Sequence, residues 1–314
     1  MPKQATDPQP IFIGGCERSG TTMLASMIGR GRHVAVIPEA QFLIRLIESF
    51  GPCECYRKSD FVRELEDDPR FAIWNIEPPG RTVDAKVNLG EYFRELITEF
   101  VEQRHIERWV DHTPWSISYM KRLLGVFPEA RFIHLVRDGR AVAASILSLP
   151  DWPFASIIGI AEHWQNRIAA GFAAQAAHPD RVITVRYEDL VSDSESELTR
   201  ICEWLGVAYE HSMLERNNAT LPAYTKGQHG LVGRKPRVER ISAWRSSLTS
   251  KQIDIFETLT GDLLEMLGYE MLGNPTRRIT RTERFAAALV DGWAAGIGRM
   301  RRRRRLRRHI KRRS

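Results

Sequence analysis

The chain has 314 residues, of which 43% are hydrophobic, a composition that excludes a disordered protein and suffices for one large core or two small ones. Its net charge of +7 is unevenly spread, because residues 299–314 contain eleven Lys or Arg and no acid. Subtracting these eleven charges leaves −4 for the remainder, so the body excludes a basic nucleic-acid-binding domain.

The cysteines and the N-terminus predict a reduced, cytoplasmic protein. Cys53 and Cys55 form a lone C-x-C, and the four cysteines show neither a CxxC pair nor zinc spacing. We therefore expect no bound metal. Residues 1–10 are polar, so we expect no secretory signal, and no apolar run reaches the length of a membrane-spanning helix.

The first predicted elements are a strand ending in two glycines, a turn and a helix. Residues 11–22 read Ile-Phe-Ile-Gly-Gly-Cys-Glu-Arg-Ser-Gly-Thr-Thr, and apolar-periodic sequence follows from Met23. Counted from Gly15, this fits a Walker A frame in which Thr21 replaces the lysine. Backbone N–H groups at a helix N-terminus can hold an anion, and Arg18 adds positive charge. The segment predicts a phosphate-binding loop; the alternative is a ligand-free turn.

Strands and helices alternate along the rest of the chain. We expect strands at residues 33–37, 109–110, 131–136 and 181–185. We expect helices at residues 41–50, 92–104, 140–149, 157–176, 195–205 (ended by Gly206) and 251–267, and one opened by Thr113 and Pro114. Residues 51–80 read as a turn-rich insertion and residues 211–238 as a loop. This alternation predicts an α/β fold with a P-loop-type central parallel sheet flanked by helices. Ligands then lie at the carboxyl ends of the strands.

A second anion site is predicted where the strand at residues 131–136 ends. Arg137 follows this strand, Asp138 can cap the next helix, and Ser145 lies about two turns along it. One guanidinium and one hydroxyl can then converge on a phosphate; the alternative is an ion pair of Arg137 with Asp138. Together with the first loop, the pair predicts a nucleotide with phosphate-type groups at opposite ends.

Arg18, Ser19, Gly20, Thr21 and Thr22 resemble the 5′-phosphosulfate loop of the sulfotransferase family. Arg137 and Ser145 resemble its 3′-phosphate pair, and the layout is most similar to the tyrosylprotein sulfotransferase-like branch and its bacterial relatives. The resemblance covers residues 11–267. It implies 3′-phosphoadenosine 5′-phosphosulfate (PAPS) as donor and 3′,5′-adenosine bisphosphate (PAP) as product. A sulfonate carries less charge than a phosphate, so no metal is required.

The resemblance also implies catalytic residues. Arg18 would neutralise charge on the leaving phosphate and the sulfonate. Glu39 stands where that branch has its catalytic glutamate and would be the base; the alternatives are a surface acid or a cap for the helix near Gln41. His112 stands where the family has a lysine. It could stabilise the transition state, protonate the leaving phosphate, act as the base with Glu39 as partner, or merely order the turn.

Further residues are implied around the nucleotide. Tyr187 would lie near it, with core packing as the alternative. Arg234 and Lys235 would cover the 3′-phosphate, although Pro236 replaces the usual glycine, and a solvated basic turn is the alternative. Three residues are weaker candidates for the acceptor side, with core packing preferred: Trp152, His163 and Trp164.

We expect a sulfotransferase domain over residues 1–275 and a basic tail, amphipathic or disordered, over residues 276–314. Phe285, Leu289 and Trp293 share one helical face next to the arginines, a pattern suited to anionic lipid surfaces. The alternatives are a disordered tail and a nucleic-acid tether, and we do not expect nucleic acid to be the partner. We expect a cytoplasmic protein, peripheral at the inner membrane face.

The predicted function is in-line transfer of a sulfuryl group from PAPS to a hydroxyl acceptor. The acceptor could be a peptide tyrosine, a carbohydrate, a lipid or a small molecule. Two alternatives remain open at this point: a P-loop kinase or NTPase, and a non-catalytic, membrane-recruited binding module.

Overall fold

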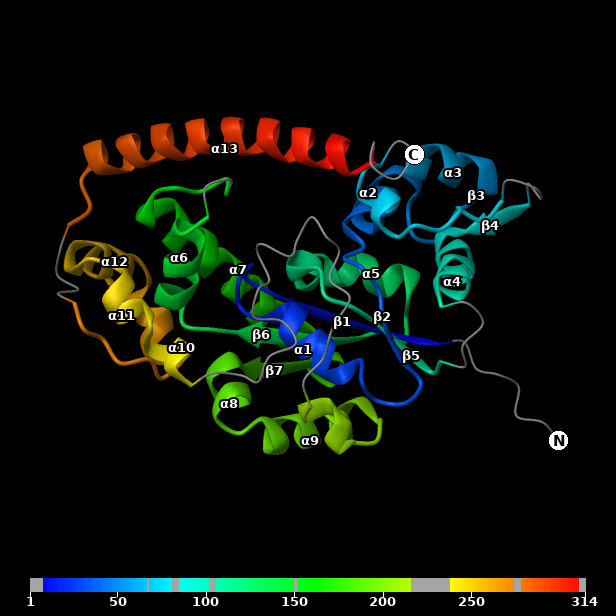
Figure 1. Ribbon diagram of the computed structural model, residues 1–314, viewed down its shortest axis with the longest axis horizontal. Helices are drawn as coiled ribbons and strands as arrows, with labels where there is room; N and C mark the ends of the chain where they lie inside the picture. Colours follow the sequence, from blue (N-terminus) through cyan, green and yellow to red (C-terminus); the bar gives the residue numbers. More distant parts are fainter. Residues whose placement is uncertain are drawn as a thin grey trace.

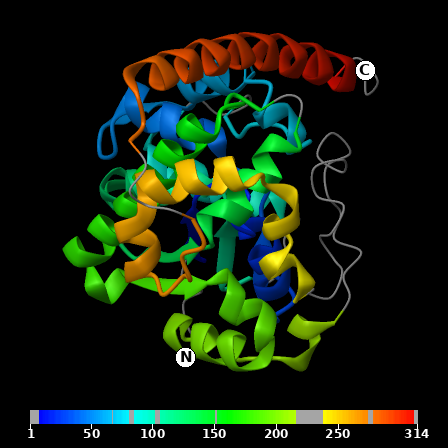
Figure 2. The same cartoon turned by 90° about the vertical axis from the view of Figure 1, so that its left-hand side faces the viewer.

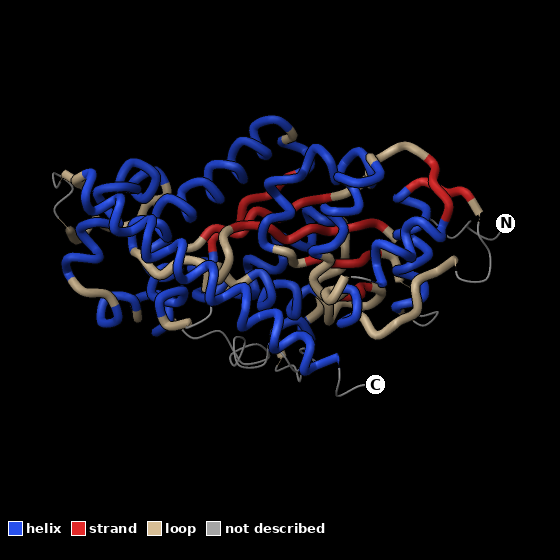
Figure 3. The backbone as a smooth tube through the Cα atoms, turned by 90° about the horizontal axis from the view of Figure 1, so that it is seen from above, coloured by secondary structure: helices blue, strands red, loops and turns tan. Residues whose placement is uncertain are grey.

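The computed structural model describes residues 8–66, 68–80, 85–101, 106–149, 152–215, 238–273 and 278–310. A five-stranded parallel sheet, in the order β2-β5-β1-β6-β7, runs through the middle of the molecule between layers of helices (Figures 1 and 3). These strands are β1 (Gln9–Gly15), β2 (Val34–Val36), β5 (Arg108–Asp111), β6 (Arg131–Val136) and β7 (Val182–Arg186). The predicted parallel α/β fold is confirmed.

Side-chain alternation along β1 divides the core into two layers. Ile11 and Ile13 join one cluster, which includes residues of α1 (Thr21–Ile28), α8 (Tyr187–Ser192) and α9 (Ser194–Leu205). Phe12, between them, packs with Trp109 and Phe132 on the opposite face. There the cover includes α2 (Gln41–Phe50), α4 (Leu89–Phe100) and α5 (Met120–Val126). Both faces are apolar because both are covered.

The second half of the chain adds helices around the end of β6. They are α6 (Gly139–Leu147), α7 (Ile157–Ala177), α10 (Glu239–Ser242), α11 (Trp244–Ser247) and α12 (Ser250–Met266). Asp138 caps α6 by accepting from the Arg140 N–H, and Gly206 ends α9 in the left-handed conformation, both as predicted.

Residues 51–80 are not merely a turn-rich insertion. They contain α3 (Lys58–Glu66) and β3 (Cys55–Arg57), which pairs antiparallel with β4 (Lys86–Asn88). The prolines lie outside α3, and within it Phe61 and Leu65 are fully buried one turn apart. This apolar spacing, rather than the surrounding turn residues, determines the local structure.

The segment after β5 also differs from its prediction. Pro114 opens a 3₁₀ turn, η2 (Pro114–Tyr119), which leads into α5. Thr113 precedes it without a side-chain cap, because its hydroxyl donates to Asp111 at 2.8 Å. Pro114 does take the first position, where its missing N–H leaves no donor unsatisfied.

The predicted tail forms a long helix, α13 (Arg281–Ile310), that lies along one side of the body (Figures 1 and 2). Among the described residues, no helix is both long enough and apolar enough to pass through a bilayer.

A buried histidine in β6 should make the fold acid-sensitive. Burial lowers the pKa of His134 from 6.5 to about 4, and its Nε2 has no partner among the described residues. The unfolded state binds this proton more tightly, so stability falls as pH drops below 6.5 and the loss is complete below about 4. We expect a loss of about 3 kcal/mol over this range, measured by urea unfolding. His134→Gln should lack this component; an equal pH dependence in that variant would contradict the assignment.

Candidate active site

The predicted phosphate loop lies between β1 and α1, at the carboxyl edge of the sheet. Gly20 has a φ of 103°, and a Cβ atom there would lie 2.8 Å from the ring of Tyr187. Thr21 and Thr22 open α1 and are buried, and no side chain caps this helix. The buried Ser19 hydroxyl has no hydrogen-bond partner among the described residues. The loop therefore offers polar groups to an anion.

The two predicted anion-binding groups, the phosphate loop and the pair of Arg137 with Ser145, adjoin each other. Arg18 Nε donates to Ser145 Oγ at 3.1 Å, and Arg137 Nη1 donates to the carbonyl oxygen of Arg18 at 2.9 Å. The Arg137 guanidinium lies 4.2 Å from the centre of the Tyr187 ring. Tyr187 thus contacts both the loop and the second anion-binding group, as its predicted position near the nucleotide requires.

Positive charge gathers around the phosphate loop. Burial lowers the pKa of Arg18, and the charges of Arg137 and Arg240 lower it further. Arg240 comes from α10, far along the chain, and no local spacing in the sequence points to it. Three cations that repel one another would be stabilised by a bound anion.

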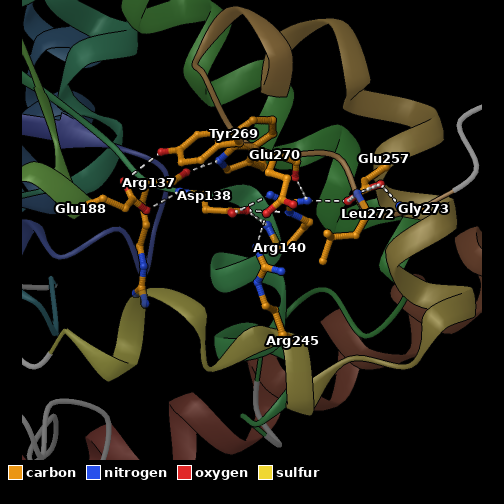
Figure 4. Close-up of polar contacts among 11 residues, drawn as sticks. Arg137, Asp138, Arg140, Glu188, Arg245, Glu257, Tyr269, Glu270, Leu272 and Gly273 are labelled. Carbon is orange, nitrogen blue, oxygen red and sulfur yellow. Dashed lines mark hydrogen bonds and ion pairs between the residues drawn. The ribbon is translucent and has the colours of Figure 1, made fainter.

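A buried polar network fixes Asp138, directly behind Arg137 (Figure 4). Asp138 binds Arg140 through both carboxylate oxygens, with Nε at 3.1 Å and Nη2 at 2.8 Å. Arg140 also contacts the Glu257 carboxylate and donates to the carbonyl oxygen of Glu270 at 2.7 Å. The alternative pairing of Arg137 with Asp138 is therefore wrong, because Arg140 takes that carboxylate.

Two further hydrogen bonds hold the peptide group between Arg137 and Asp138. The indole of Trp164 donates to the Arg137 carbonyl oxygen at 3.1 Å, and Glu188 accepts from the Asp138 N–H at 3.0 Å. Tyr269 Oη in turn donates to Glu188 at 2.9 Å (Figure 4). Trp164 is fully buried, which agrees with the preferred prediction that it packs in the core. From the core, its hydrogen bond orients the backbone of Arg137.

Glu39 and His112 face each other at the ends of neighbouring strands. Glu39 Oε1 lies 3.8 Å from His112 Nδ1, and Gln41 Nε2 donates to Glu39 Oε2. Burial raises the pKa of Glu39 and lowers the pKa of His112, so burial favours the uncharged form of both. Ala40, not Glu39, precedes α2 as its cap residue, so the capping alternative for Glu39 is wrong.

Asp111 ties the two strand ends together. Its Oδ1 accepts from the Ala40 N–H at 3.3 Å and from the Thr113 N–H at 3.0 Å. Ala40 follows Glu39, and Thr113 follows His112, so one buried carboxylate sets the spacing of the candidate pair.

A second carboxylate, missed by sequence reasoning, lies within the phosphate loop. Glu17 Oε2 is 2.6 Å from His163 Nε2, and Glu17 Oε1 is 3.5 Å from Arg167. Burial by itself would raise the pKa of Glu17, but the hydrogen bond and charges of these partners outweigh it and lower the pKa. The charge of Glu17 contributes to the raised pKa of Glu39. Carboxylates tuned in opposite directions are typical of acid–base sites.

The same cluster contains potential metal ligands without being an evident metal site. Atoms of Cys16, Glu17 and His163 lie within 4.8 Å of one another. Burial raises the pKa of the Cys16 thiol well above its usual value, which favours the protonated form rather than the thiolate that binds metals. The hydrogen bond between Glu17 and His163 accounts for the remaining two groups.

The remaining predicted residues lie outside this cluster or outside the described residues. Arg234 and Lys235 fall in the undescribed residues 216–237. Trp152 is partly buried against the core around α6 and α7. Arg70, from the segment predicted to be an insertion, lowers the pKa of Glu39 against the effect of burial, and no motif around Arg70 predicts this role.

Residues 10–211 match the model of the sulfotransferase family. The chain belongs to this family. In this sulfotransferase the matched residues include the phosphate loop, Glu39, His112, Arg137, Ser145 and Tyr187.

Two relatives and one solved structure illustrate the similarity. This sulfotransferase is 23% identical to a protein-tyrosine sulfotransferase of Drosophila melanogaster over 84% of the chain and 52% of that relative, so it spans about half the relative's length. It is 26% identical to the omega-hydroxy-beta-dihydromenaquinone-9 sulfotransferase Stf3 of Mycobacterium bovis, over 64% of the chain and 63% of that enzyme. The sulfotransferase domain from the curacin biosynthetic pathway shares the fold, with a TM-score of 0.61 and 17% identity. The match covers 84% of this chain and 99% of that domain.

The family assignment confirms the predicted sulfotransferase class, and PAPS is the donor that this class implies. It sets aside the kinase alternative. The site fits such a donor, because Ser19 Oγ and Arg137 Nε are buried without partners among the described residues. The roles of individual residues remain predictions.

Proposed function

We propose that Glu39 is the base that accepts the proton of the acceptor hydroxyl. The observation that carries the proposal is the placement of this buried carboxylate beside His112, with a pKa raised by burial. A base with a raised pKa holds the abstracted proton better near neutral pH. As the acceptor O–H bond breaks, its oxygen forms the new bond to sulfur, the proton passes to Glu39, and the bond from sulfur to the 5′-phosphate breaks.

The other site residues bind the donor and neutralise its negative charge. PAPS, when bound, supplies the sulfuryl group. Arg18 and the N–H groups from Ser19 to Thr22 would hold its phosphosulfate end. Arg137, Ser145 and Tyr187 would hold its 3′-phosphate. Burial favours the neutral form of His112, so we assign it the role of a hydrogen-bond donor beside Glu39.

The proposed acceptor class is a hydroxyl group. The names of the two relatives give protein tyrosine and an omega-hydroxylated menaquinone, and both offer an O–H bond to a carboxylate base. A peptide tyrosine, a carbohydrate, a lipid or a small molecule satisfies the same chemistry. Among these we favour an acceptor held at a membrane, and we propose a cytoplasmic enzyme acting at the inner membrane face. Exposed apolar side chains of α13 support this location.

Donor binding can be tested without knowing the acceptor. We expect PAP in EDTA to raise the melting temperature, since a ligand that binds only the folded state stabilises it. Arg137→Ala should weaken PAP binding about 10- to 150-fold through loss of charge-assisted hydrogen bonds. The matched control is Arg122→Ala, because Arg122 is exposed and pairs with Glu48. Stabilisation by ATP with magnesium but not by PAP would contradict the donor site.

A further inference from the structure

α13 is held against the body by one face. Asp291 accepts from the Ala155 N–H at 2.7 Å, from the Ser156 N–H at 2.8 Å and from the Ser156 hydroxyl at 2.6 Å. Arg284 pairs with Glu162 on α7, and Ala287 is buried beside Ile158. The contacts extend over two turns of α13, so this part of the tail is a docked element with a defined orientation.

The opposite face carries large apolar side chains in the open. The exposed fractions are 67% for Phe285, 60% for Leu289, 73% for Trp293 and 57% for Met300. At 3.6 residues per turn these four lie within about 80° of arc, roughly opposite Arg284, Ala287 and Asp291. We call Phe285, Leu289, Trp293 and Met300 the outer stripe. A contiguous exposed stripe of this kind marks an interaction surface.

The charge beside the outer stripe identifies the partner. The helix continues into eight arginines within residues 299–308, followed by three more Lys or Arg within residues 311–313. A second copy would bring two such runs together, which is electrostatically unfavourable, and nucleic acid would leave the outer stripe exposed. An anionic lipid surface satisfies both features, since apolar side chains enter the interface while arginines meet headgroups.

We propose that α13 docks the enzyme on an anionic membrane surface through the outer stripe and the arginine run. This docking rests on the proposed location at the inner membrane face and does not depend on the proposed catalytic chemistry. The helix lies on the bilayer with Asp291 toward the protein. α7 contacts α13 near Ser156 and the phosphate loop through His163, so the docked helix is connected to the site by one element.

The docking surface is tested by flotation of the full chain with two kinds of vesicle. One is phosphatidylcholine alone, and the other is phosphatidylcholine with phosphatidylglycerol. We expect binding to the anionic vesicles that weakens with added salt. The triple variant Phe285→Ser, Leu289→Ser, Trp293→Ser should bind at least about 100-fold more weakly, because three apolar side chains no longer enter the interface. Met266→Ser, at a 63% exposed position on α12, is the matched control.

Several outcomes would overturn the proposal. Two concern the vesicles: unchanged binding by the triple variant, or equal binding of the wild type to both kinds of vesicle. Two point to another partner: tight binding of duplex DNA without vesicle binding, or a wild-type dimer in light scattering that the triple variant loses. Should the triple variant not fold, Trp293→Ser alone provides the same comparison. PAP stabilisation of the same variants should be unchanged. If PAP stabilised neither the wild type nor any variant, this would count against the donor site but leave the membrane result intact.

Discussion

Replacing Glu39 with glutamine should lower kcat by about 10²–10⁴-fold, the range that a positioned general base contributes. The glutamine keeps the shape of the side chain but cannot accept the acceptor proton. PAP binding should change little, because the hydrogen bonds from Arg18 to Ser145 and from Arg137 to the Arg18 carbonyl oxygen do not involve Glu39. The measurement is single-turnover transfer with saturating PAPS, and the matched control is Glu48→Gln, an exposed residue of α2.

The pH dependence supplies a second readout of the same variant. Glu39 must be ionised to act as the base, and burial raises its pKa above 4.5. Activity should therefore fall on the acid side at a pH above 4.5, and Glu39→Gln should lack this acid limb. If Glu39→Gln kept full activity while His112→Gln lost it together with the acid limb, His112 would be the base.

Arg140→Met should destabilise the fold by about 3–5 kcal/mol. Arg140 is almost fully buried between Asp138 and Glu257, and its removal leaves both carboxylates buried without their shared cation. The free energy of unfolding in urea measures the effect. Arg245→Met is the matched control: Arg245 also lies over the Trp244 ring but is 45% exposed, so the change should stay within about 0.5 kcal/mol.

A double variant separates charge from packing. Adding Glu257→Gln to Arg140→Met should recover part of the lost stability, because one uncompensated charge is removed. Arg140→Met should also weaken PAP binding, since Asp138 no longer holds the backbone of Arg137 in place. Equal stability of Arg140→Met and Arg245→Met would show that the buried pair contributes little.

Local patterns were sufficient for the elements that build the phosphate-binding edge. The alternation of side chains predicted the strand of Arg131 to Val136 at its observed bounds. The glycine and the two threonines at the start of α1 predicted the loop. Asp138 and Gly206 were recognised because capping chemistry is confined to a few neighbouring residues. In α3 the surrounding prolines and glycines obscured a short apolar face.

Contacts between residues far apart in the sequence could not be predicted from local patterns. Glu17 and His163 lie 146 residues apart, and neither belongs to a spacing that signals the other. Arg70 and Arg240 act on the site from segments without a recognisable motif. The alternative pairing of Arg137 with Asp138 could not be ruled out from the sequence for the same reason: Arg140 takes that carboxylate, and Glu257, from α12, helps to bury Arg140.

The arrangement around Arg140 has a consequence for synthesis of the chain. Glu257 is made 117 residues after Arg140, outside the residues 10–211 matched by the family. During translation the strands of the sheet emerge first, while Arg140 still lacks one of its two carboxylates. Closing so long a loop is a slow step. The nascent chain can therefore form its phosphate loop early, but the network that holds Asp138, next to Arg137, is completed only after α12 has left the ribosome.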